Sequence, residues 1–515
     1  MANAGSSAAL DSPPLGGGEA KTAASHAGLF KRSGLLIGLA ALVAVILLPQ
    51  PEGLSVAGQH MLGIFAFAVI VWMTEAVDYA ASSIILLALM AFLLGIAPDP
   101  AHPGHLLGTH AALSAALAGF TNSAVALIAA ALVIAAAMAI TGLDKRVAYK
   151  VIALIGIGRS RILIGTIIIM ALLAFFIPTA SARVACLTPI MLGMISALGI
   201  DKKSRTAGML MLAVAYLSLI WAIGIATGAA QNVYVNALMD RTIHVSISWI
   251  DWLIVGAPFS IAMSVALYVV LMKMMPPQPD EIAATKKIDP ASLKALAREL
   301  GPMTGEQKKL LLISLVLVGF WATQGKLHHF DSSSVAVAAV ALMFVPKIGV
   351  LEWKQVQSRF PWGILVQLGV GVGLGIELLR TGAAGWLASF VVNEFGVQHL
   401  SIFAILAILW LFLIVVHLGF ASGAAMATTM IPVMLSVLQQ AQIPADKIAG
   451  MTMLLAFVTS VGWILPINGP QNMLAFGTGT FEARDFIRVG TVLTVIAYAM
   501  LLLFAATYWH WLGYV

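Results

Sequence analysis

Four short polar segments interrupt long apolar runs, and they are the positions at which this sequence could do chemistry. They span residues 178–181, 226–232, 421–424 and 466–472, and each contains Gly or Pro. A helix that breaks inside an apolar run leaves backbone N–H and C=O groups unpaired, which hydrocarbon tolerates only where they line a polar cavity. N–H groups at the start of a half-helix attract anions, whereas free C=O groups coordinate cations. The pattern therefore predicts ion binding.

Two ionisable residues lie close to these interruptions, Arg183 and His417. An Arg inside a bilayer costs at least ~2.5 kcal/mol on insertion scales, so it marks a pathway or a counter-ion. We expect the guanidinium of Arg183 to pair with a substrate carboxylate. The alternative is that it binds the C-terminal carbonyls of a neighbouring half-helix. His417 could relay a proton, but we expect it to be a hydrogen-bonded packing residue.

The composition assigns the chain to the integral membrane class. Hydrophobic residues make up 61% of the 515 residues and charged residues 10%, with a mean hydropathy of +0.99. A soluble domain carries about 25% charged residues. The apolar runs are continuous rather than alternating, which predicts helices and not a barrel. One cysteine, Cys186, excludes a disulfide framework and a multi-cysteine metal site.

The distribution of basic residues predicts the topology. With a cytoplasmic N-terminus and two re-entrant hairpins, four of the 28 Lys and Arg residues fall outside (Arg241, Lys326, Arg380 and Lys447) and Arg183 falls within a hairpin. The formal charge of +6 therefore reflects cytoplasmic loops, and we expect no nucleic-acid partner. The predicted divisions are a disordered cytoplasmic tail 1–33, a first repeat 34–275 with hairpin 162–198, a cytoplasmic linker 276–309, and a second repeat 310–515 with hairpin 401–440.

Three landmarks recur in the same order in both halves. Thr141-Gly142 matches Thr381-Gly382 and Gln231-Asn232 matches Gln471-Asn472, both at an offset of 240 residues, while Pro189 matches Pro432 at an offset of 243. Basic residues flank the first hairpin, and the stretch 382–401 before the second has none. The two copies therefore open to opposite faces. This predicts an all-α polytopic fold with about eleven transmembrane helices and two hairpins in two inverted repeats.

Inverted repeats with paired broken helices are typical of alternating-access transporters, with the binding site near the midplane. An intramembrane enzyme would need a nucleophile–base pair or metal ligands on facing helices. The sequence contains no HExxH, GxSxG or paired Asp motif. We therefore expect no enzyme, and the broken repeats argue against a channel.

Three segments resemble the divalent anion/sodium symporter family, the carriers of di- and tricarboxylates and sulfate. They are VWMTEAVDYAASSIILL at 71–87, ITGLDKRVA at 140–148 and ILPINGPQNMLAFGTGTFEARDFIRVG at 464–490. The resemblance runs from about residue 34 over most of the chain. It implies a homodimer in the bilayer, with a scaffold region and a transport region that moves like an elevator.

The family carries Ser-Asn-Thr at each hairpin tip, where this chain has Thr179-Ala180-Ser181 and Ser422-Gly423-Ala424. Both asparagines, which bind sodium and substrate carboxylates in the family, are replaced. We expect a small anion to bind between the tips. The predicted substrate site comprises Thr179, Ala180, Ser181, Arg183, Asn232, Ser422, Gly423, Ala424 and Asn472, and the predicted sodium site comprises Thr179, Gly228, Ser422 and Asn468.

The predicted function is secondary transport of small organic anions, di- or tricarboxylates, across the inner membrane. Ion symport and anion exchange both remain open; we expect no organic cofactor, and Na⁺ is the one candidate ion. The alternative is an oxyanion or sulfonate transporter or efflux permease of the same superfamily.

Overall fold

The computed structural model describes residues 19–99, 102, 104–156, 158–197, 199–278, 281, 301–394, 396 and 399–515. Within these ranges the fold is all-α, with two isolated β-bridges and no strand. In the part of the chain that the structure describes, six helices are long and apolar enough to cross a membrane, and five shorter apolar segments accompany them. The all-α polytopic fold predicted from the sequence is confirmed.

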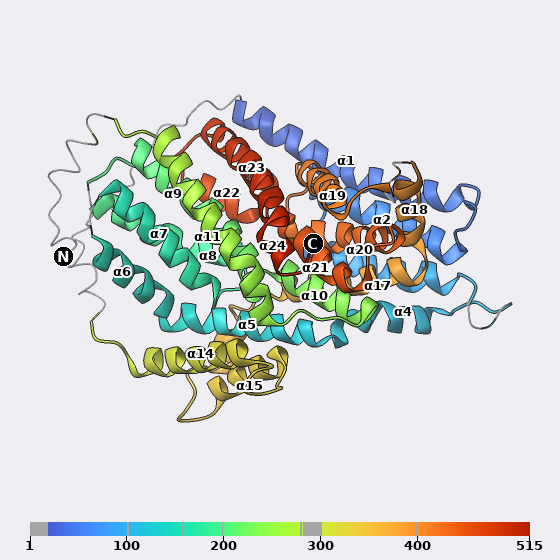
Figure 1. The fold of residues 1–515 in the computed structure, drawn as a ribbon, viewed down its shortest axis with the longest axis horizontal. Coiled ribbons are helices and arrows are strands. Elements are labelled where there is room, and N and C mark those ends of the chain that lie inside the picture. The colour runs from blue at the N-terminus through green and yellow to red at the C-terminus, as the bar shows by residue number, and fades with distance from the viewer. Residues whose placement is uncertain are drawn as a thin grey trace, which may run out of the picture.

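The first half runs from the N-terminal helix to the linker (Figure 1). Its elements are α1 (Glu19–Leu47), α2 (Val56–Thr74), α3 (Tyr79–Leu89), η1 (Met90–Leu94), α4 (Thr109–Leu117), η2 (Ala118–Thr121), α5 (Ser123–Thr141), α6 (Leu143–Ile155), α7 (Arg159–Ala174), α8 (Ala180–Ala197), α9 (Arg205–Gly224), η3 (Ala226–Gly228), α10 (Ala230–Ile243) and α11 (Trp249–Met274).

The second half repeats this order from the linker to the C-terminus. Its elements are α14 (Gly305–Thr323), α15 (Ser332–Phe344), α16 (Trp353–Gln357), α17 (Trp362–Arg380), α18 (Ala383–Glu394), α19 (Ile402–His417), α20 (Gly423–Gln440), α21 (Ala445–Val458), η5 (Pro466–Asn468), α22 (Pro470–Phe476), α23 (Ala483–Ala506) and α24 (Tyr508–Trp511).

Each half contains one hairpin and one broken helix. The hairpins are the pairs α7–α8 and α19–α20, and the broken helices are α9–η3–α10 and α21–η5–α22. The Thr-Gly landmarks mark helix ends, because Gly142 and Gly382 adopt positive φ angles of 68° and 80°. A glycine in this left-handed conformation commonly ends a helix. The landmarks found in the sequence therefore mark equivalent elements of two repeats.

The core lies around α9, whose side chains are almost all buried. This helix packs against α7, α8 and α11, and α11 lies beside α23 (Figure 1). A second close contact joins α17 to α4 and η2. A Cβ at Gly373 would lie 2.1 Å from the carbonyl oxygen of Ala116, so only glycine allows this approach. The contact fixes α17 against the N-terminal end of α5.

The N-terminal helix begins earlier than the sequence indicates. Helix α1 starts at Glu19, so residues 19–33, assigned above to the tail, are helical. Residues 1–18 lie outside the described residues, as does most of the predicted linker 276–309.

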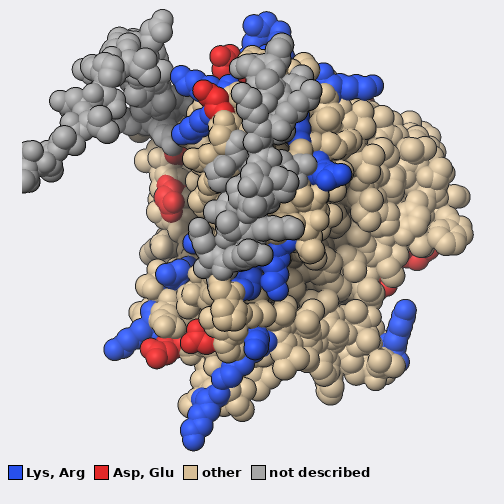
Figure 2. Space-filling model, turned by 90° about the vertical axis from the view of Figure 1, so that its left-hand side faces the viewer, with Lys and Arg blue, Asp and Glu red and all other residues tan. Residues whose placement is uncertain are grey.

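Lys and Arg side chains are spread over one end of the molecule. Figure 2 views the left-hand side of Figure 1, where α6 and the turn to α7 lie. Helix α6 carries the exposed Lys145 and Lys150. We refer to this end as the basic face.

Candidate functional site

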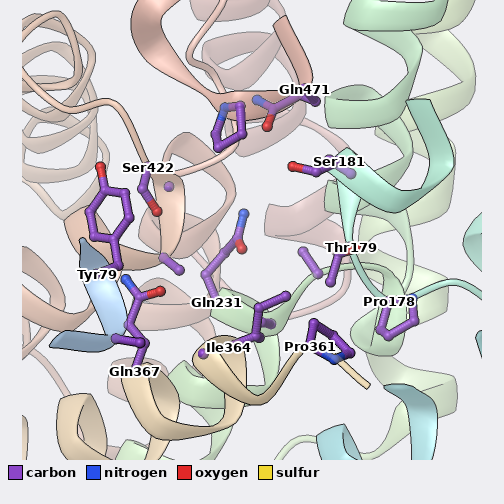
Figure 3. Close-up of a pocket in the computed structure, with 18 of the residues that line it drawn as sticks. Tyr79, Pro178, Thr179, Ser181, Gln231, Pro361, Ile364, Gln367, Ser422 and Gln471 are labelled. Carbon is purple, nitrogen blue, oxygen red and sulfur yellow. The ribbon is translucent and has the colours of Figure 1, made fainter. Parts of the chain in front are cut away.

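A cavity of about 310 Å³ lies between the two hairpin tips. Figure 3 shows Ser181 and Ser422 on opposite sides of it, Gln231 between them, and Gln367 beside Tyr79. The predicted site residues that line it are Thr179, Ala180, Ser181, Ser422, Gly423 and Ala424. The structure thus brings together the two tips, which are more than 240 residues apart in the sequence.

Five helices of the described chain begin at this cavity. Ala180, Ala230 and Gly423 are the first residues of α8, α10 and α20, and all three line it, as do Tyr79 and Pro470, which begin α3 and the short α22. The first N–H groups of a helix have no partner within the helix, and its N-terminus carries a partial positive charge. The N-terminus of α3 is already capped by the Asp78 carboxylate. The ends of α8, α10 and α20 at one cavity favour an anion.

Hydroxyl groups at the tips cap α8 and α20. The Thr179 hydroxyl accepts a hydrogen bond from the Ala182 N–H at 3.2 Å, and that of Ser422 accepts one from the Ala425 N–H at 3.3 Å. An accepting hydroxyl still has its own hydrogen to donate. The helix that follows each tip is therefore capped in the same way, and both tips keep a hydroxyl donor at the cavity.

The guanidinium of Arg183 does not line the cavity. It is fully buried behind the first tip and contacts three backbone carbonyls. Its Nη1 donates to the Ile177 and Gly228 oxygens at 2.6 and 2.7 Å, and its Nη2 donates to the Ser218 oxygen at 2.6 Å. These are the contacts of the alternative interpretation, and we correct the expected pairing of Arg183 with substrate accordingly.

Asn468 binds backbone carbonyls at the second tip, as Arg183 does at the first. Its Nδ2 donates to the carbonyl oxygens of His417, Leu418 and Phe420 at 2.8, 3.2 and 3.0 Å. His417 is buried and its Nδ1 lies 3.3 Å from the Val458 oxygen, so its ring is a hydrogen-bonded packing group in this structure, as expected. A neutral amide thus binds the carbonyls that end α19.

Asn232 and Asn472 stabilise the breaks in the two interrupted helices. The Nδ2 of Asn232 donates to the Ala222 oxygen at 2.6 Å, and that of Asn472 donates to the Gly462 oxygen at 2.9 Å. Neither residue lines the cavity between the tips. Both buried Oδ1 atoms lack a hydrogen-bond partner. Their position in the repeat was predicted correctly, but the structure places them behind the site.

Three glutamines in the cavity were not predicted as site residues: Gln231, Gln367 and Gln471. Gln231 donates to the Ser460 hydroxyl at 3.0 Å, which joins the two broken helices. Two of them were visible as landmarks of the repeat. Gln367 is a lone polar residue in the apolar first part of α17, and that isolation was the available signal.

The residues predicted to bind sodium are not gathered in one place. Thr179 and Ser422 line the cavity, whereas the Gly228 oxygen accepts from Arg183 and Asn468 binds the second hairpin. The described residues lining the cavity include one carboxylate, Asp78, and no Lys, Arg or His. Among the described residues no cluster of His, Cys, Asp and Glu could hold a metal ion. Neutral donors and helix ends therefore dominate the site.

The chain matches the family model described as the sodium:sulfate symporter transmembrane region over residues 30–515. A membrane protein of Cupriavidus necator is 50% identical over 94% of this chain and 93% of its own length. The sodium-dependent dicarboxylate transporter SdcS of Staphylococcus saprophyticus is 26% identical, covering 91% and 90% of the two chains.

The citrate/succinate antiporter of Escherichia coli K12 is also 26% identical, over 91% of this chain and 96% of its own. Among solved structures, the YdaH transporter of Alcanivorax borkumensis superposes with a TM-score of 0.51 at 12% identity, covering 83% of this chain and 97% of its own. That likeness concerns the fold alone. The match over nearly the whole chain, together with the paired hairpins and broken helices, shows that this protein belongs to the sodium:sulfate symporter family of membrane transporters.

Proposed function

We propose that the protein carries small organic anions, di- or tricarboxylates, across the inner membrane and binds them between the two hairpin tips. The observation that carries this proposal is the convergence of the N-termini of α8, α10 and α20 on one cavity. Relatives named as a dicarboxylate transporter and a citrate/succinate antiporter support the substrate class. A relative named as an inner membrane protein of Escherichia coli supports the location.

The environment of Arg183 favours anion exchange over sodium symport. Carbonyls at the ends of half-helices and in unwound segments are the groups that coordinate Na⁺ in transporters of this plan. In the first half, two such carbonyls, of Ile177 and Gly228, and the Ser218 carbonyl of α9 surround a guanidinium, which stays charged at all physiological pH values. The covalently attached guanidinium therefore occupies the place that a free Na⁺ would take among these carbonyls.

The proposed movement carries the tips between the two faces. The basic face is cytoplasmic by the positive-inside rule, and the N-terminus lies on that side. In the proposed elevator cycle, the hairpins and broken helices slide against α5 and α17. We further propose that two copies of the chain associate through their scaffold regions, as the resemblance implies.

Uptake of labelled succinate and citrate into proteoliposomes tests the proposal. We expect uptake to require an internal anion and to be independent of a sodium gradient. Uptake that requires sodium and no internal anion would identify a symporter and reject the role given to Arg183. If labelled sulfate or a sulfonate enters while both carboxylates fail, the alternative substrate class is correct.

A further inference from the structure

A second cavity, of about 740 Å³, lies on the other side of the first broken helix. It is lined by the N-terminal end of α5, by Asn232 and Asn236 of α10, and by the α10–α11 and α14–α15 loops. Helices α11 and α14 both join the linker at their opposite ends. The second cavity therefore lies at the end of the molecule away from the linker.

The two cavities are lined by equivalent positions of the two repeats. The 240-residue offset that relates the Thr-Gly landmarks also relates three positions of α17 to three of α5. Gly363, Ile364 and Gln367 line the first cavity, and Ser123, Ala124 and Leu127 line the second. Equivalent faces of the equivalent helices α5 and α17 thus line one cavity in each half.

A second pair of elements confirms this equivalence. Asp78 caps α3 by accepting from the Ala80 and Ala81 N–H groups at 2.9 and 3.3 Å. Asp331 caps α15 in the same way, accepting from the Ser333 and Ser334 N–H groups at 2.9 and 3.0 Å. Asp78 lines the first cavity and Asp331 lines the second. Two independent elements therefore relate the cavities by the repeat symmetry.

The hairpin tips line the first cavity and not the second. We propose that the second cavity is the outer access path, where the tips meet α5 when the site faces outward. Gln367 then binds the anion only from the cytoplasmic side, and Leu127 takes its place on the outer side. This inference rests on the proposed transport function. It adds that Gln367 makes the affinity for the anion different on the two sides of the membrane.

Gln367 suits this role because its amide is buried and unsatisfied. The side chain is 8% exposed, its Nε2 has no hydrogen-bond partner, and Figure 3 shows it at the wall of the cavity. A buried donor without a partner gains most from an acceptor such as a carboxylate oxygen. Leu127 is equally buried, at 8%, and has nothing to donate. The anion should therefore bind more tightly from the cytoplasm.

The succinate concentration that gives half-maximal uptake, measured in intact cells and in inverted membrane vesicles, tests the inference. We expect Gln367→Leu to raise the value about tenfold in inverted vesicles and to leave it unchanged in cells. Leu127→Gln should lower the value in cells alone. Gln357→Leu, at an exposed position of α16, is the matched control and should change neither. Equal shifts on both sides for Gln367→Leu would overturn the inference.

Cysteine labelling separates this inference from the transport proposal. The chain has one cysteine, so Ala124→Cys and Ile364→Cys can each be placed in a Cys186→Ser background. A membrane-impermeant thiol reagent should label Ala124→Cys in cells and Ile364→Cys in inverted vesicles. Labelling of both from the same side would overturn the assignment of two opposite access paths. Opposite labelling without any succinate uptake would leave the paths standing and reject succinate as the substrate.

Discussion

The two hairpin tips satisfy their free backbone carbonyls with different side chains. Each has carbonyl oxygens at the end of a half-helix that hydrocarbon cannot satisfy. The first half uses the guanidinium of Arg183, which reaches carbonyls of the hairpin, of α9 and of the unwound segment. The second half uses the amide of Asn468, which binds three carbonyls of one turn. The comparison shows that one repeat carries a fixed charge and the other a neutral donor.

The largest effect is expected from Arg183→Gln. A hydrogen bond from a charged group contributes about 1.5–3 kcal/mol, and three are lost or weakened in this variant. We expect anion exchange to fall about 100-fold or more and the melting temperature in detergent to drop clearly. Arg183→Lys keeps the charge on a single nitrogen. Its exchange rate and melting temperature should lie between those of Arg183→Gln and the parent protein. Normal exchange and stability in Arg183→Gln would contradict the account of the first tip.

A smaller effect is expected from Asn468→Leu. Neutral hydrogen bonds contribute about 1 kcal/mol each, so the loss is on the order of 2 kcal/mol after relaxation. The melting temperature should fall less than in Arg183→Gln, and exchange should be reduced but measurable. Asn468→Asp should be worse than Asn468→Leu, since it places a carboxylate against the same carbonyls. The reverse order of the two Asn468 variants would show that packing, not hydrogen bonding, holds the second tip.

The smallest effect, and an equal one in both halves, is expected from removing the caps. Replacing a capping Ser or Thr by Ala costs about 1 kcal/mol. Thr179→Ala and Ser422→Ala should therefore each raise the half-saturation for succinate about fivefold, and Thr179→Ser should restore the parent value. Markedly unequal effects would show that the two tips do not share the anion equally.

The fold was predictable because its signals are local. Long apolar runs, Thr-Gly helix ends and short polar breaks predicted the helices, hairpins and repeats. The breaks at 226–232 and 466–472 lie where the structure has η3 and η5. The start of α1 was missed because residues 19–33 lack the apolar run that marked the other helices.

The site was predictable only in part, because its contacts are not local. The sequence predicts that the two tips lie together, since the hairpins position them, and in the structure both line one cavity. The partners of Arg183 at Ser218 and Gly228 lie 35 and 45 residues away, and no spacing rule connects them. Gln367 belongs to a helix that meets the tips only through tertiary packing. Asn232 and Asn472 were assigned to the site because the pattern shows a polar residue but not the side it faces.

The carbonyl shell around Arg183 also has a kinetic consequence. A carrier that must capture a dissolved ion passes through an ion-free state and needs an obligatory order of loading. A side chain joined to α8 by covalent bonds is present before every encounter and never diffuses away. Under the proposed anion exchange, the first tip is organised for the anion in every cycle, whatever the salt composition on either side. The steady state of such an exchanger would follow the ratio of anion concentrations across the membrane.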